Sequence, residues 1–120
     1  MAVRAIRGAI QLDVDEREHL LDCTRQLVRE VLRANDLPTE SLISILFTVT
    51  ADLRSEFPAL AARELGLGDV PLLCTTEIDV PGALPRVVRL MAHAELDVPR
   101  SDVRHVYLRG AEQLRRDLAQ

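Results

Sequence analysis

Residues 70–93, VPLLCTTEIDVPGALPRVVRLMAH, contain the pattern that decides the fold. The segment from about Val70 to Glu77 is apolar and ends in two threonines, a composition typical of a β-strand. Residues 80–82, Val-Pro-Gly, predict a turn, and Pro85 is acceptable in the first turn of a helix. We therefore expect a strand, a turn and a helix in immediate succession.

The apolar residues after the turn fit the period of a helix. The predicted buried stripe consists of Leu84, Val87, Val88 and Met91. A second face, at spacings of three and four residues, would carry Arg86, Arg89 and His93. A solvent-exposed basic face is the simplest interpretation of the second set.

The strand before the turn poses a geometric question. Side chains alternate between the two faces of a strand, so Cys74 and Thr76 should lie on one face and Thr75 and Glu77 on the other. If Cys74 and Glu77 contact one ligand, the strand must twist, bulge or end between them.

The remaining chain predicts alternating strands and helices. Residues 2–10 are predicted to form a strand with Val3, Ala5, Arg7 and Ala9 on one face. The simplest interpretation of Arg7 is that it lies at the edge of the sheet or in solvent. A helix of about five turns follows, opened by a capping box (Asp13 with Glu16, or Asp15 with Glu18) and ended by residues 35–38. We further expect a strand over 42–50, a short helix from Pro58 to Gly66, a strand over 103–108 and a polar, mobile tail from Arg109.

This order indicates one domain, residues 1–120, of the α/β (α+β) class. The expected fold is a mixed four- to five-stranded sheet with two main helices. Hydrophobic residues make up 48% of the 120 residues, which permits a core of modest size.

Composition excludes several classes. The apolar runs are much shorter than the roughly 20 residues that span a bilayer, and the first ten residues lack signal-peptide architecture. Two cysteines are too few for a disulfide framework, so we expect a reduced, cytoplasmic compartment. The formal charge of −4 and the scarcity of aromatic residues argue against a nucleic-acid surface.

Motifs for cofactors and metals are missing. The sequence has no glycine-rich nucleotide loop and no His, Cys, Asp and Glu spacing typical of a metal site, so we expect no cofactor and no metal. A nucleophilic pair of Cys74 with His93 or His105 has only weak support, because sequence separation says nothing of contact. All fifteen basic residues are arginines, whose planar guanidinium binds carboxylates in a bidentate manner. The candidate groups for a small dicarboxylate that bears a hydroxyl are Arg7, Arg63, Arg89, Glu77, Tyr107 and the tail residues Arg115 and Arg116.

Four segments, in order, carry a family resemblance: IRGAIQLDVD, TADLRSEFPALAARELG, VPLLCTTEIDVPGALPRVVRLM and DVRHVYLRGAEQLRRDL. Together they resemble the barrel-like trimeric class of monofunctional chorismate mutase over nearly the whole chain. The resemblance implies a homotrimer whose sheets pack as a pseudo-barrel, with active sites at the subunit interfaces. It also implies conversion of chorismate to prephenate, toward phenylalanine and tyrosine, without metal or cofactor.

The resemblance also implies roles for individual residues. Arg89 would stabilise charge on the ether oxygen of the substrate, Glu77 would accept from its ring hydroxyl, and Arg7 would bind a carboxylate. Substrate contacts from the same subunit would be Cys74 and Tyr107, with Leu72 and Leu73 in the wall and Leu114 and Arg115 closing the site. The neighbouring subunit would supply Phe57, Ala59 and Arg63. Leu60 stands where the family can carry a lysine, and Arg116 where a proline is usual.

Three other interpretations stay open at this point. A non-catalytic trimeric protein that binds a small carboxylate would use the same arginines, and a structural α/β module would leave them as surface. A thiol-dependent enzyme based on Cys74 is a further alternative.

Overall fold

The computed structural model describes residues 2–114 and contains a mixed five-stranded sheet in the order β3-β2-β4-β1-β5. The strands are β1 (Val3–Gln11), β2 (Leu42–Val49), β3 (Leu72–Thr76), β4 (Val87–Glu95) and β5 (Val106–Leu108). Strand β4 is antiparallel to both β1 and β2, whereas β5 is parallel to β1 and β3 is parallel to β2. The expected mixed sheet is confirmed.

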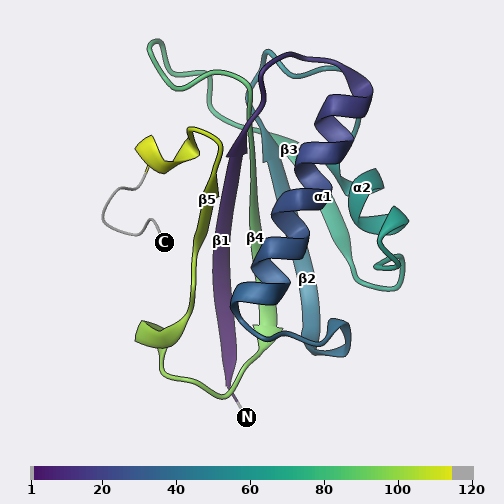
Figure 1. Ribbon diagram of the computed structural model, residues 1–120, viewed down its shortest axis with the longest axis vertical. Coiled ribbons are helices and arrows are strands. Elements are labelled where there is room, and N and C mark those ends of the chain that lie inside the picture. Colours follow the sequence, from purple (N-terminus) through teal and green to yellow (C-terminus); the bar gives the residue numbers. More distant parts are fainter. Residues whose placement is uncertain (1, 115–120) are drawn as a thin grey trace.

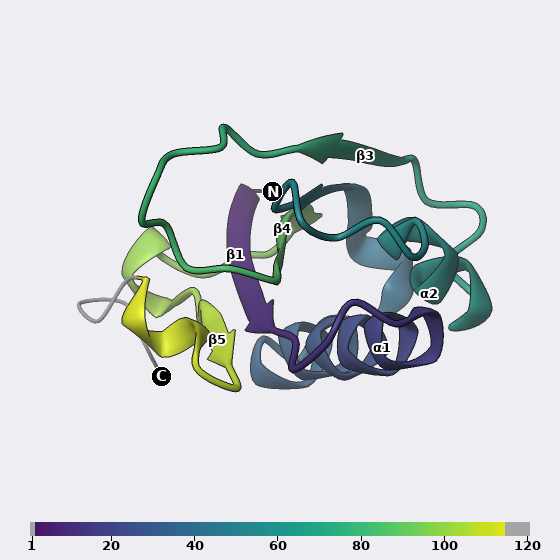
Figure 2. The same ribbon diagram turned by 90° about the horizontal axis from the view of Figure 1, so that it is seen from above.

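Two helices, α1 (Arg17–Ala34) and α2 (Pro58–Glu64), lie on the same face of the sheet (Figures 1 and 2). The side chain of Glu16 caps α1 by accepting from the backbone N–H groups of Glu18 and His19, so neither expected capping box forms. Helix α2 begins at Pro58 and ends before Gly66, whose φ of 89° is typical of a helix C-terminus. The predicted short helix is confirmed.

The core fills the space between the helices and the sheet. Strand β1 presents Ile6, Gly8 and Ile10 to α1, and each of them is buried. A Cβ atom at Gly8 would lie 3.2 Å from side-chain atoms of Leu27 and of Val31 in α1. The absence of a side chain at Gly8 therefore sets how closely α1 approaches the sheet.

The expected helix after Pro85 is wrong: this segment is the central strand β4. Its apolar residues fit two periods, because Val87, Val88 and Met91 satisfy helical spacing while Val88, Leu90, Ala92 and Ala94 alternate. The alternating set is buried against the core, and Met91 is 36% exposed. Hydrogen bonding to a strand on each side selects the alternating period. Local sequence does not show this pairing, because both partner strands are distant in the chain.

Three smaller expectations also change. Strand β3 begins at Leu72 rather than near residue 70, and β5 is limited to three residues, preceded by a 3₁₀ turn at Arg100–Asp102. Strand β1 lies between β4 and β5, so Arg7 is not at a sheet edge. The start of the expected tail forms a 3₁₀ turn, Ala111–Gln113, and another 3₁₀ turn, Thr39–Ser41, precedes β2. Residues 115–120 of the tail lie outside the described residues.

Neither helix in the described range is long and apolar enough to cross a membrane.

We expect Gly8→Ala to lower the free energy of unfolding by about 1–3 kcal/mol, because the added methyl group overpacks the contact between α1 and β1. Chemical denaturation measures the change. Gly68→Ala is the matched control, since a Cβ there meets no atom within 4 Å and the expected change is below about 0.5 kcal/mol. Equal effects at the two positions would show that Gly8 does not set the helix–sheet distance.

Candidate functional site

One row of directly paired residues crosses all five strands. It runs Thr75, Thr48, Arg89, Ala9 and Tyr107. Paired residues on neighbouring strands point to the same face, and this row alternates with residues such as Phe47 and Leu90 that are buried in the core. The row therefore belongs to the face of the sheet opposite the helices, which we call the open face.

Arg89 and Glu77 form an ion pair on the open face. Arg89 Nε lies 3.0 Å from Glu77 Oε1, with side chains that are 42% and 20% exposed. Glu77 directly follows β3, and its backbone N–H donates to the carbonyl of Val49, which holds it beside β2. Arg89 is fixed at the middle of the row by hydrogen bonding of β4 on both sides. The strand–turn unit thus brings the predicted carboxylate and guanidinium together.

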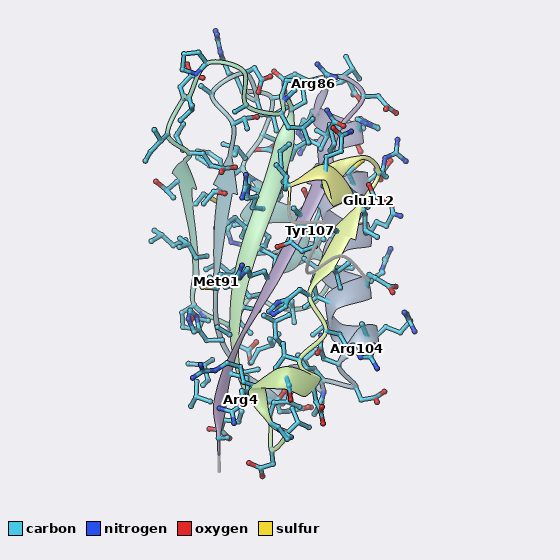
Figure 3. All side chains as sticks on the ribbon, turned by 90° about the vertical axis from the view of Figure 1, so that its left-hand side faces the viewer. Arg4, Arg86, Met91, Arg104, Tyr107 and Glu112 are labelled. Atoms are coloured by element: carbon cyan, nitrogen blue, oxygen red, sulfur yellow. The ribbon has the colours of Figure 1, made fainter. Side chains whose placement is uncertain are left out.

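Arg7 lies in the next row of the open face. It pairs with Met91, two residues along β4 from Arg89, a diagonal separation of roughly 7–8 Å that long side chains can bridge. Met91 points away from α1 (Figure 3). The backbone N–H of Arg7 donates to His105 Nδ1 at 3.0 Å, so His105 supports the backbone of β1. Within residues 2–114 no ion pair joins Arg7 to a carboxylate.

Tyr107 is held at the other end of the row by the turn that follows β5 (Figure 3). It is 5% exposed and packs with Ala9, Val87 and Ala111, and Leu114 packs against the same cluster. Arg109 and Gly110 both have positive φ, 53° and 94°, and Arg109 also pairs with Asp13 at 2.6 Å. This turn places Ala111 and Leu114 against Tyr107 on the open face.

Cys74 is on the other face of the sheet. It pairs with Phe47 and packs against the core, as the alternation of the strand predicts. Together with Phe57, Pro58 and Thr75 it lines a cleft of about 430 Å³ at the edge of the sheet. Within one chain, Cys74 therefore does not join Arg89 and Glu77, and it shares its surroundings with Phe57 instead.

The other predicted site residues are divided between these two places. Leu73 is 65% exposed on the open face, but Leu72 faces the core. Ala59 is buried in α2, while Arg63 is exposed in the last turn of that helix. Arg115 lies outside the described residues.

The environment of Phe57 is fixed by Glu56. The carboxylate of Glu56 accepts from the backbone N–H of Phe57 and from Arg17 Nε, both at 2.9 Å, and these hydrogen bonds lower its pKa. Phe57 itself is 68% exposed at the start of α2. A large aromatic ring is thereby held in an exposed position, where it can pack against a ligand or a second chain.

The second thiol, Cys23, is buried in α1, and burial raises its pKa. A raised pKa disfavours the thiolate, so Cys23 is poorly suited to act as a nucleophile. Among residues 2–114, no three His, Cys, Asp or Glu side chains are grouped so that they could hold a metal ion.

The open face thus combines two guanidinium groups, one carboxylate and one phenol. Such a set can bind an anionic ligand that has a hydroxyl, and it places fixed charges around that ligand without a group suited to covalent attack.

Comparisons with known proteins point to one family. The model of the family "Chorismate mutase type I" matches residues 3–118. The chain is 50% identical to chorismate mutase AroH of Thermus thermophilus over 97% of this chain and 96% of that protein. It is 40% identical to chorismate mutase AroH of Bacillus subtilis (strain 168), over 99% and 94% respectively. A solved structure of a chorismate mutase from Clostridium thermocellum superimposes with a TM-score of 0.89 at 42% identity, covering 91% of this chain and 97% of that one.

The ion pair between Arg89 and Glu77 should contribute little to stability, because it is partly exposed to solvent. We expect Glu77→Gln, Arg89→Gln and the double variant each to unfold within about 1 kcal/mol of the parent in chemical denaturation. A loss of more than about 3 kcal/mol in a single variant would instead indicate a buried structural pair.

Proposed function

The chain belongs to the chorismate mutase type I family, isomerases that convert chorismate to prephenate, and we propose that it does so on the open face around Arg89. The observation that carries this placement is the Arg89–Glu77 pair, with Arg7 one row away and Tyr107 in the same row. The product feeds the biosynthesis of aromatic amino acids.

The reaction needs positioning and electrostatics rather than proton transfer. Chorismate rearranges within one molecule: its ether C–O bond breaks while a C–C bond forms, and no atom enters or leaves. The protein must hold chorismate in its compact reactive conformer. Binding energy then offsets the conformational entropy that the substrate loses on reaching this conformer. The protein must also stabilise the negative charge that develops on the ether oxygen.

Arg89 is the group we assign to the ether oxygen. Its backbone is fixed at the centre of the sheet and its Nε lies 3.0 Å from Glu77 Oε1, so little reorganisation would be needed when charge develops. Glu77, at 3.0 Å from Arg89, would accept from the ring hydroxyl of the substrate. The negative charge of this carboxylate would also stabilise positive charge that develops on the ring of the substrate in the transition state.

Arg7 and Tyr107 would bind a carboxylate of the substrate. Arg7 lies on β1, which pairs with β4, and Tyr107 lies on β5, which pairs with β1, while Leu114 packs against the cluster that contains Tyr107. We assign Leu114 and Arg115 to closure of the site, with Arg115 adding a further positive charge near the dianion.

A homotrimer would complete this site. The open face carries no α-helix in the described part of the chain and exposes Val3, Leu73 and Met91, which is typical of a surface covered by another protein chain. We propose that the three sheets pack as a pseudo-barrel through these faces. In this arrangement the cleft with Phe57 and Cys74, and Arg63 on the adjacent helix α2, would meet the Arg89 group of a neighbouring subunit. Cys74 is thus grouped with Phe57 rather than with Arg89.

We propose that the enzyme works in the cytoplasm. Both cysteines are free, which fits a reducing compartment.

Chorismate turnover tests the reaction directly. Purified protein should convert chorismate to prephenate without added metal or cofactor, and Arg89→Ala should lower kcat about 100- to 1000-fold, because it removes the charge at the ether oxygen. Absorbance of chorismate measures the rate. Arg29→Ala, which removes an exposed arginine on α1, is the control and should leave the rate unchanged. Binding of chorismate without turnover would favour a non-catalytic binding protein.

Subunit mixing tests the shared site. Arg89→Ala and Arg63→Ala homotrimers should each be impaired, whereas co-refolded mixtures should regain activity, because some interfaces then combine two unmutated halves. For equal mixing, about a quarter of the sites should be intact in a cyclic trimer. Light scattering should give the mass of three chains. A mixture no more active than its two components would place both arginines in sites of single chains.

A further inference from the structure

Polar side-chain atoms without a hydrogen-bond partner are concentrated at one place in the described structure. Within residues 2–114 there are four such buried atoms: Thr48 Oγ1, Ser55 Oγ, Glu77 Oε2 and Arg89 Nε. Three of the four belong to the open face around the Arg89–Glu77 pair. Arg89 Nε approaches Glu77 Oε1 at 3.0 Å but is not aligned for a hydrogen bond.

Thr48 is the member of this group that neither the sequence nor the family resemblance singled out. It pairs with Arg89 on one side and with Thr75 on the other, so its side chain points to the open face between them. The residue that follows it, Val49, accepts the hydrogen bond from the backbone of Glu77. The backbone of Thr48 is therefore paired directly with Arg89 and is adjacent to the residue that holds the backbone of Glu77.

A buried hydroxyl without a partner is costly. The desolvation of the hydroxyl is not offset by a hydrogen bond, and a valine of the same shape would avoid this loss of stability. The neighbouring strand positions on the helix side, Phe47 and Val49, are apolar. A hydroxyl at position 48 is explained if a ligand supplies the missing partner.

The chemistry of the three atoms defines that ligand. Arg89 Nε donates, Glu77 Oε2 accepts, and a threonine hydroxyl can do both. An oxygen-rich ligand with a hydroxyl and a carboxylate satisfies all three together.

We propose that Thr48 is a further substrate-binding residue, whose hydroxyl donates a hydrogen bond to an oxygen of the bound substrate beside Arg89. This inference rests on the proposed function, because it places chorismate on the open face. The contact exists in the bound substrate as well as in the transition state, so it contributes to binding rather than to turnover.

Thr48→Val tests the role, because it removes the hydroxyl and keeps the shape. The expected result is a KM for chorismate that rises about three- to tenfold, with kcat within about twofold of the parent. The melting temperature without ligand should be unchanged or higher, since an unpaired polar atom is lost, while the increase in melting temperature caused by prephenate should shrink. Thr48→Ser should restore the parental KM, because it restores the hydroxyl.

Ser44→Ala is the matched control. Ser44 lies on the same strand and face, but its hydroxyl is within 3.3 Å of His93 Nδ1 and lies two rows from Arg89. It should leave KM unchanged.

Three outcomes would overturn the inference. An unchanged KM in Thr48→Val would show that the hydroxyl does not touch the substrate. A lower melting temperature, or loss of the oligomer in light scattering, would show that Thr48 binds within the protein or to a neighbouring subunit. If the unmodified protein shows no turnover of chorismate, the proposed function fails first, and the assignment of Thr48 fails with it.

Discussion

The pairing of β4 on both of its sides is the constraint on which the rest of the structure depends. Because β1 and β2 both bind it, the position of each side chain on β4 is fixed relative to two neighbours. Arg89 is therefore opposite Ala9 on one strand and Thr48 on the other, with no freedom to slip by one residue, since a slip would turn Leu90 and Ala92 out of the core. In our proposal this strand carries the catalytic charge, and a group on a rigid strand is held more firmly than one on a loop.

The sheet separates two tasks between its faces. The helix side carries the packing that holds the domain together, and Gly8 permits the close approach of α1. The open face carries a partly exposed ion pair and buried polar atoms without hydrogen-bond partners. These features add little to stability, and the unpaired atoms reduce it. Such a loss of stability is common where a protein binds and transforms a ligand.

The same separation explains why a single chain is an incomplete enzyme in our proposal. Cys74 lies on the opposite face of the sheet from Arg89, and the cleft that it lines with Phe57 is at the edge strand β3. Exposed apolar residues on the open face provide a reason for chains to associate. Association would cover this surface and, in the same step, bring the two halves of the site together.

The helix that the sequence predicts after Pro85 does not form. The sequence alone did predict the mixed sheet, helix α1, the short helix α2, strand β3 and the alternation that separates Cys74 from Glu77. These features depend on local periodicity and on residues such as Pro58 and Gly66, whose backbone preferences act over a few positions. The family, and Arg89 and Glu77 as candidate site residues, were also predicted from the sequence, through the segments that resemble the family. Only the tertiary structure decided that Val87–Glu95 is a strand, because both periods fit its apolar residues and pairing with two distant strands selects one. It alone revealed Thr48, since a threonine in an apolar strand looks like an ordinary strand residue until its neighbours across the sheet are known.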